Sequence, residues 1–197
     1  IDGGDGFDHI IYTSEGVGDD GAAPSGVVVN LATGTATDGF GNTDTLSGIE
    51  GVHGSLLADQ LTGNAGANSF HGYAGNDTID GGDGIDTVSY SNDRQVALNY
   101  FMPLELGVNV NLTSGTATDG FGNTDTLVSI ENVHGTGYAD TIAGSAGANI
   151  LNAGGGDDNV SGQARTDTLD GGDGNATLYG NQDTDTLNGG LGDDSLY

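Results

Sequence analysis

The chain of 197 residues contains no cysteine and no tryptophan, and only two of its residues are basic. Without cysteine, neither disulfide bonds nor zinc sites built on thiolates are available to stabilise a fold. The two basic residues are Arg94 and Arg165, which are too few to form the basic patch that binds nucleic acid. No apolar stretch approaches the roughly 20 residues that a membrane-spanning helix needs. We therefore expect neither a nucleic-acid partner nor a membrane span.

Acidic residues and glycine dominate what the sequence does contain. The 29 acidic residues give a formal net charge of −27, and 39 residues are glycine. Because like charges repel and only 34% of the residues are hydrophobic, this composition alone is typical of a disordered chain. A compact fold therefore requires cations that neutralise the carboxylates and a pattern that buries the few apolar side chains.

A nine-residue pattern provides the means to bury the few apolar side chains. Each repeat has glycine first, Asp or Asn sixth and an apolar residue eighth, and repeats run without gaps over 54–89 and 135–197 and once more over 3–11. Ala153 replaces one first-position glycine, and Ala176 replaces one sixth-position acid. So short a period predicts a stacked solenoid, because a three-residue strand buries its apolar side chain only against the next coil.

The sixth residue of each repeat is the candidate metal ligand. If two repeats make one coil, sixth residues of alternate repeats form columns, such as Asp59 above Asp77. Stacked carboxylates about 5 Å apart repel unless a cation lies between them, and oxygen ligands in flexible glycine loops suit Ca²⁺ better than Mg²⁺. The candidates are Asp8, Asp59, Asn68, Asp77, Asp86, Asp140, Asn149, Asp158, Asp167, Asp185 and Asp194.

The repeats GYAGNDTID (72–80) and GGDGIDTVS (81–89) resemble the calcium-binding nonapeptides of the RTX family, G-G-x-G-x-D-x-U-x. The resemblance implies an all-β fold, a right-handed parallel β-roll or β-helix solenoid with Ca²⁺ bound between stacked turns. It also implies that sixth-position Asp residues and loop carbonyl oxygens hold several ions, with Gly72, Gly81 and Asp83 among the loop residues at these sites. Among the sixth-position Asp residues, Asp8, Asp77, Asp86, Asp158 and Asp194 match best, because their loops keep the fourth-position glycine.

Members of the RTX family leave Gram-negative bacteria by type I secretion, so the resemblance implies a secreted protein that acts outside the cell or at its surface. The chain begins at Ile1 rather than Met, and we expect it to be a fragment of a larger protein. In a cytosol poor in Ca²⁺ we expect the module to be disordered, and to become rigid on binding Ca²⁺ after export.

A longer duplication lies over the short repeat. Residues 26–89 align with 107–170 at a constant offset of 81, and 34–46 is identical to 115–127. We expect one continuous module over 1–197, with insertions at 14–25 and 90–106. The spacers are expected to continue the stack as wider or irregular coils, with Asp44 and Asp125 at sixth positions as further calcium candidates.

Two interpretations are open for some residues outside the nonapeptides. The spacer acids are either secondary calcium ligands or turn caps and surface acids, and they are Asp38, Asp44, Glu50, Asp119, Asp125 and Glu131. The 90–106 insertion carries an aromatic segment, 100–104, which is either a contact surface or a loop folded back onto the roll.

The predicted function is calcium-dependent structure rather than catalysis. The four histidines form no zinc or nucleophile motif, and the many carboxylates keep the phase of the repeat rather than standing out as a catalytic pair. Two other classes fit the sequence. One is a module that binds a cell-surface glycan or a protein, attached to a secreted enzyme. The other is a filament, surface-layer or adhesin segment that assembles through its coil ends, since uncapped solenoid ends are prone to stack.

Overall fold

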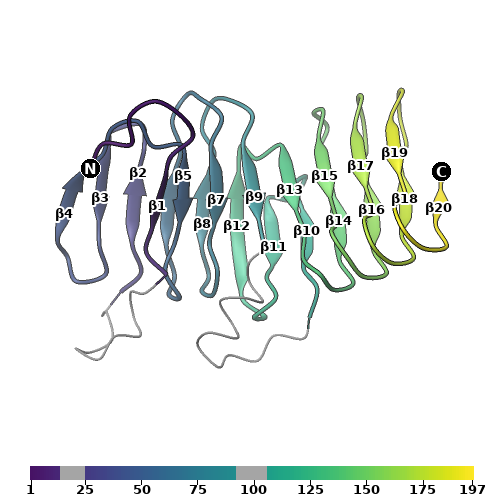
Figure 1. Ribbon diagram of the computed structural model, residues 1–197, viewed down its shortest axis with the longest axis horizontal. Helices are drawn as coiled ribbons and strands as arrows, with labels where there is room; N and C mark the ends of the chain where they lie inside the picture. Colours follow the sequence, from purple (N-terminus) through teal and green to yellow (C-terminus); the bar gives the residue numbers. More distant parts are fainter. Residues whose placement is uncertain (14–24, 92–105) are drawn as a thin grey trace.

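The computed structural model describes residues 1–13, 25–91 and 106–197, which form a two-layered stack of short strands (Figure 1). Within these ranges the chain forms twenty strands and no helix, and therefore no helix long and apolar enough to cross a membrane. The insertions predicted at 14–25 and 90–106, with the aromatic segment 100–104, lie almost wholly outside the described residues.

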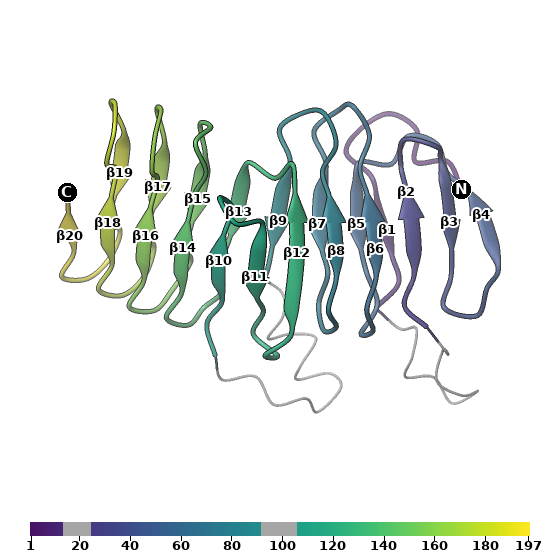
Figure 2. The same cartoon turned by 180° about the vertical axis from the view of Figure 1, so that it is seen from behind.

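Two sheets make up the layers, and the repeats alternate between them along the chain (Figures 1 and 2). The eight-stranded sheet contains, in spatial order, β1 (His9–Ile11), β5 (Gly51–His53), β7 (Ser69–His71), β9 (Thr87–Ser89), β13 (Asn132–His134), β15 (Ile150–Asn152), β17 (Thr168–Asp170) and β19 (Thr186–Asn188). The twelve-stranded sheet contains β20 (Ser195–Leu196), β18 (Thr177–Tyr179), β16 (Asn159–Ser161), β14 (Thr141–Ala143), β10 (Asn109–Asn111), β11 (Thr116–Thr118), β12 (Thr124–Val128), β8 (Thr78–Asp80), β6 (Gln60–Thr62), β2 (Val28–Asn30), β3 (Thr35–Thr37) and β4 (Thr43–Thr45).

The strand register confirms that two nonapeptides make one coil. Leu61 pairs with Ile79 between β6 and β8, and Leu151 pairs with Leu169 between β15 and β17, both in parallel. Each partner lies two repeats further along the chain, so eighth residues stack on eighth residues and sixth residues on sixth residues. The parallel β-roll expected from the repeat is the observed fold.

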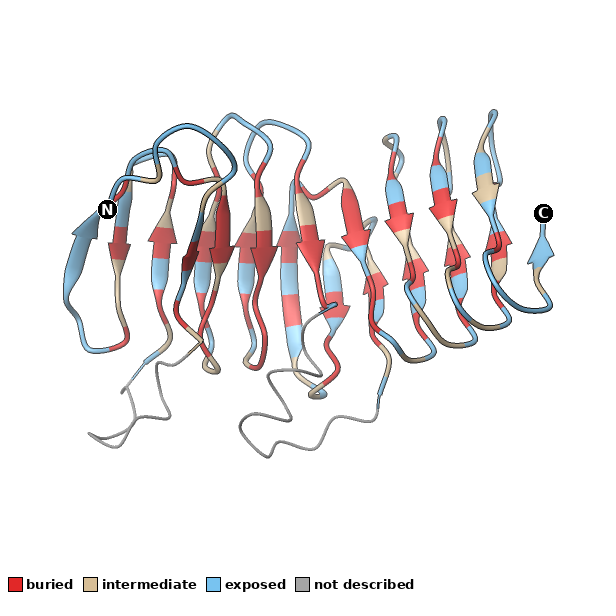
Figure 3. Ribbon diagram, in the orientation of Figure 1, coloured by how far each residue is buried: buried red, intermediate tan, exposed pale blue. Residues whose placement is uncertain are grey.

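The core is a row of apolar side chains between the two sheets. The middle residue of most strands is buried and its neighbours are more exposed, as the banding in Figure 3 shows. Phe70, Leu151 and Leu169 are fully buried, and burying a side chain of this size stabilises the fold by about 1.5–3 kcal/mol. Leu196 in β20, the terminal strand of the twelve-stranded sheet, is 47% exposed.

The spacers continue the stack as expected, but they do so as antiparallel meanders rather than as wider or irregular coils. In each spacer three strands form an antiparallel meander, β2–β3–β4 in the first and β10–β11–β12 in the second. The reversal between β11 and β12 is capped by Asp119, whose Oδ1 accepts the N–H groups of Phe121 and Asn123 at 2.9 and 2.7 Å. Asp38 caps the equivalent turn in the first spacer. Side-chain caps of this kind favour a tight turn over a continuing coil.

The second meander joins the two repeat blocks. β12 pairs in parallel with β8 on one side, and β10 pairs in parallel with β14 on the other. Among the described strands, the first meander pairs with a repeat through β2 and β6, and β4 is an edge strand whose residues are all exposed.

Candidate metal centre

Sixth-position side chains form two hydrogen-bonded columns, one beside each sheet. Oδ1 of Asp77 accepts the backbone N–H of Asp59 at 2.9 Å, and Oδ1 of Asp158 accepts that of Asp140 at 2.8 Å. The same bond recurs at Asn68–Asp86, Asn149–Asp167, Asp167–Asp185 and Ala176–Asp194, but Ala176 has no side-chain oxygen to offer the N–H of Asp158 in the repeat below it. The repulsion expected between stacked carboxylates is therefore partly relieved, since each Asp directs one oxygen to a peptide N–H.

Spacer acids continue these columns. Oδ1 of Asp125 accepts the N–H of Asp77 at 3.0 Å, and the carboxylates of Glu50 and Glu131 accept the N–H groups of Asp8 and Asp86 at 3.0 and 2.9 Å. Asp125 is therefore buried beneath β8, as a sixth residue would be. Its duplicate Asp44 is exposed, because it lies on the edge strand β4.

The loops that carry the sixth residues fall into two conformations. In eight of them the second and fourth residues both have positive φ, and we call these the open loops; their repeats begin at Gly3, Gly72, Gly81, Ala153, Gly162, Gly171, Gly180 and Gly189. In the remaining four neither residue has positive φ, and we call these the closed loops; their repeats begin at Gly54, Gly63, Gly135 and Gly144. The second residues of the closed loops are Ser55, Asn64, Thr136 and Ser145.

In a closed loop, protein donors reach the sixth side chain. The backbone N–H of Ser55 donates to Oδ2 of Asp59 at 2.6 Å, while the Ser55 hydroxyl and the N–H of Val27 both donate to Oδ1 at 2.7 Å. The duplicate loop repeats this arrangement, with Thr136 and Val108 donating to Asp140.

The other two closed loops have an amide at the sixth position. Oδ1 of Asn68 accepts the N–H of Asn64 at 2.8 Å, and its Nδ2 donates to the carbonyl of Glu50 at 3.2 Å. Asn149 does the same with Ser145 and Glu131. In all four closed loops the side-chain oxygens of the sixth residue thus have hydrogen-bond partners.

In five of the open loops, one buried carboxylate oxygen is left without such a partner. The Oδ2 atoms of Asp77, Asp86, Asp158 and Asp167 are buried and accept no hydrogen bond, and the same holds for Oδ2 of Asp8. A Cβ added at the first-position Gly72 would lie 2.2 Å from Oδ2 of Asp77, so this glycine gives the carboxylate its space. Leaving a buried polar oxygen unpaired costs on the order of 1–3 kcal/mol, and more for a charge. A hard cation would remove that cost, so these loops fit Ca²⁺.

Burial also shifts the pKa values of these carboxyl groups. It raises the pKa of Asp77 to about 9, with the neighbouring Asp125 adding to the effect, and that of Asp125 to about 7. It raises the pKa values of Asp86 and Asp158 to about 6 against the opposing effect of backbone hydrogen bonds. The pKa values of Asp140 and Asp167 are raised for the same reason. A cation would favour the charged form at each group and reverse these shifts.

The donor set of each loop is small. Among the residues that the structure describes, no three Asp, Glu or His side chains converge as a metal-binding group. A bound Ca²⁺, which takes six to eight oxygen ligands, would therefore complete its shell with backbone carbonyl oxygens and water. Of the remaining predicted site residues, Gly72 and Gly81 are buried at first positions, whereas Asp83 is exposed. Asp185 and Asp194 lie in the last coils and are partly exposed.

Sequence reasoning overlooked the second-position residues. Ser55, Thr136 and Ser145 were available as a signal, because Ser and Thr bond readily to nearby backbone and favour local turns. It also assigned Tyr90 to an insertion. Tyr90 is in fact fully buried, and its hydroxyl donates to Oδ2 of Asp125 at 3.1 Å.

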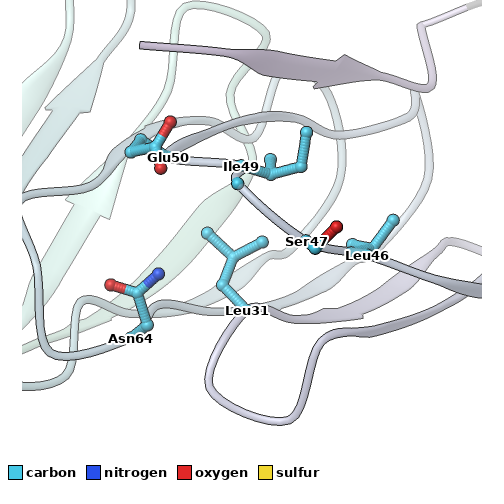
Figure 4. Close-up of a pocket in the computed structure, with 7 residues that line it drawn as sticks. Leu31, Leu46, Ser47, Ile49, Glu50 and Asn64 are labelled. Carbon is cyan, nitrogen blue, oxygen red and sulfur yellow. The ribbon is translucent and has the colours of Figure 1, made fainter. Parts of the chain in front are cut away.

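Two pockets among the described residues are poor sites for an organic substrate. The one in Figure 4 lies where the first meander meets the first nonapeptide coil; it measures about 70 Å³, and Leu31, Ile49, Glu50 and Asn64 are among its lining residues. A larger hollow of about 400 Å³ between Leu57, Ala74 and Phe121 is lined by no carboxylate, histidine or hydroxyl side chain. Substrate pockets usually combine several hundred Å³ with a few convergent polar groups.

Comparison with known families agrees with this geometry. The family model of the RTX calcium-binding nonapeptide repeat (4 copies) matches residues 53–88, 134–164 and 161–196, which together make up just over half of the chain. The matches cover both nonapeptide blocks and leave out most of the spacers. No curated protein matches the chain.

Proposed function

The chain belongs to the RTX calcium-binding nonapeptide repeat family, whose repeats bind Ca²⁺, and we propose that ion binding drives the folding of one continuous structural module over 1–197. The family is a structural repeat rather than a catalytic one, and we propose no enzymatic activity for this module. Its role is to convert Ca²⁺ binding at the loops into packing of the apolar row between the sheets.

The buried Oδ2 atoms of the open loops carry this proposal. Asp77, Asp86, Asp158 and Asp167 bring carboxylates into the fold without a hydrogen-bond partner for one oxygen. The chain has 29 acidic residues against two basic ones, so protein cations cannot balance them. Calcium therefore both relieves the local cost and lowers the overall self-repulsion.

The concentration of Ca²⁺ on each side of the cell envelope determines where the chain would fold. RTX repeats are typical of proteins secreted by Gram-negative bacteria, where the cytosol is poor in Ca²⁺ and the surroundings are rich in it. We propose that the chain is exported in an unfolded state and becomes a rigid roll outside the cell, as part of a larger secreted protein.

A calcium titration followed by far-UV circular dichroism tests the proposal. Starting in chelator at neutral pH, the chain should show little β structure and should gain it cooperatively as Ca²⁺ is added, but not with Mg²⁺. A full β spectrum already present in chelator would contradict it.

Association through a coil end is a second candidate function. β4 is an edge strand at one end of the twelve-stranded sheet, and all its residues are exposed. An exposed edge strand favours pairing with a strand of another molecule. Light scattering that increases with protein concentration in saturating Ca²⁺ would support it, and a constant monomer mass would exclude it.

A further inference from the structure

The two loop conformations differ in whether hydrogen-bond donors reach every side-chain oxygen of the sixth residue. In the closed loops, Asp59 has donors on both oxygens, from Ser55 and Val27, and Asp140 has the equivalent donors. A carboxylate already surrounded by N–H and O–H donors would have to give up these bonds to bind a cation. In the open loops, Asp77 and Asp158 each keep one buried oxygen free of donors.

The distribution of amides follows the same division. Both sixth-position amides, Asn68 and Asn149, lie in closed loops, where the Nδ2 group donates to a backbone carbonyl of the preceding coil. A carboxylate in that place would face the same carbonyl with like polarity. In the open loops the sixth residue is an Asp everywhere except Ala176. Negative charge is thus kept where donors are missing and is dispensable where they are present.

The backbone φ angles also distinguish the open loops from the closed loops. In the open loops Tyr73, Gln163, Arg165, Asn181 and Asp183 have φ between 68° and 81°, a region that side-chain-bearing residues seldom occupy. Such conformations persist where other interactions hold them in place. The closed loops contain no positive φ at the corresponding positions, even at Gly66 and Gly147.

The closed loops also share one place in the fold. They make up the first coil of each nonapeptide block, which a meander and one further strand precede, and Asp59 and Asp140 accept the N–H groups of Val27 and Val108 at the start of that meander. The first coil is therefore tied to the spacer by protein hydrogen bonds, and the open loops of 72–89 and 153–197 follow it.

We propose that Ca²⁺ binds only at the open loops, and that the four closed loops take no ion because Ser55, Asn64, Thr136 and Ser145 supply donors in its place. This inference rests on the proposed function and refines it. Asp59, Asn68, Asp140 and Asn149 are then structural residues that link each repeat block to its spacer, and the calcium ligands among the sixth residues are Asp8, Asp77, Asp86, Asp158, Asp167, Asp185 and Asp194.

The internal duplication provides a matched experiment on the full chain. One double variant is Asp59→Asn with Asp140→Asn, which changes the closed loops; the other is Asp77→Asn with Asp158→Asn, which makes the same change in the open loops. Native mass spectrometry in saturating Ca²⁺ counts the ions bound to each chain. We expect the closed-loop variant to keep the wild-type number and the open-loop variant to bind fewer ions.

A closed-loop variant that loses as many ions as the open-loop variant would overturn the inference. If either variant fails to fold, crystals of the wild-type chain grown in Ca²⁺ decide the matter, because anomalous scattering locates each ion. Peaks beside Asp77 and Asp158 with none beside Asp59 and Asp140 support the inference, and peaks at all four refute it. A wild-type chain that folds fully in chelator would instead refute the proposed function.

Discussion

In the absence of Ca²⁺, acid should stabilise this fold, and Asp125 shows why. Its carboxyl group is fully buried, and its oxygens accept the N–H of Asp77 and the hydroxyl of Tyr90. Burial raises its pKa from 3.8 to about 7. Between these two values the folded chain keeps a proton that the unfolded chain has already released, so stability falls as the pH rises.

The size of the effect follows from linkage. The contribution is fully present below the unfolded pKa of about 4 and is lost as the pH rises through about 7. Roughly three pKa units at about 1.4 kcal/mol each amount to on the order of 4 kcal/mol, a large part of the 5–15 kcal/mol that stabilises a typical domain. The raised pKa values of Asp77, Asp86 and Asp158 act in the same direction.

Circular dichroism of the chain in chelator, recorded from about pH 8 down to about pH 5, measures the effect as the fraction of chain that folds. We expect greater stability at the lower pH, and a smaller difference in the Asp125→Asn variant, whose neutral amide still offers an oxygen to the N–H of Asp77. In saturating Ca²⁺ the order should reverse, because protons then compete with the ion. A chelated chain that is more stable at pH 8, or a variant with an undiminished pH dependence, would refute the reasoning.

Three further changes test packing, loop geometry and ion choice. Leu169→Ala, at a fully buried position, should lower the free energy of unfolding in Ca²⁺ by about 2–5 kcal/mol, whereas Ile150→Ala at an exposed position should change it little; thermal melts compare the two. Gly174→Ala should weaken Ca²⁺-induced folding, since φ is 121° and the new Cβ would lie 2.1 Å from the Gly156 oxygen, while Gly137→Ala meets no atom within 4 Å. Mg²⁺ should fail to replace Ca²⁺ in the same melts, because it demands a tighter octahedron.

The repeat period made the architecture predictable. A glycine, an acid and an apolar residue recurring in phase determine which side chains must stack, and the pairing of Leu61 with Ile79 follows from that alone. The meanders were not predictable in the same way. Leu46 and Leu127 point inward as eighth residues should, but burial does not reveal strand direction, and the turn caps Asp38 and Asp119 were read as either ligands or caps.

The loop conformations were harder still to read from the sequence. A glycine at the fourth position does not identify the open loops. Gly66 and Gly147 lie in closed loops, whereas Arg165 and Asp183 have positive φ at the fourth position of open loops. The second residue is more informative at Ser55, Thr136 and Ser145. It is not decisive, because Asn64 lies in a closed loop and Asn181 in an open loop; Asn tolerates both a turn and a left-handed backbone.

Small-angle X-ray scattering at neutral pH, in chelator and then in Ca²⁺, tests most directly whether the ion makes the fold. An unfolded chain of this length has a radius of gyration of about 48 Å, and a compact one about 16 Å. We predict an expanded chain in chelator whose radius falls most of the way toward the compact value with Ca²⁺ and stays large with Mg²⁺. A chain that is already compact in chelator, with no change on adding Ca²⁺, would contradict the account.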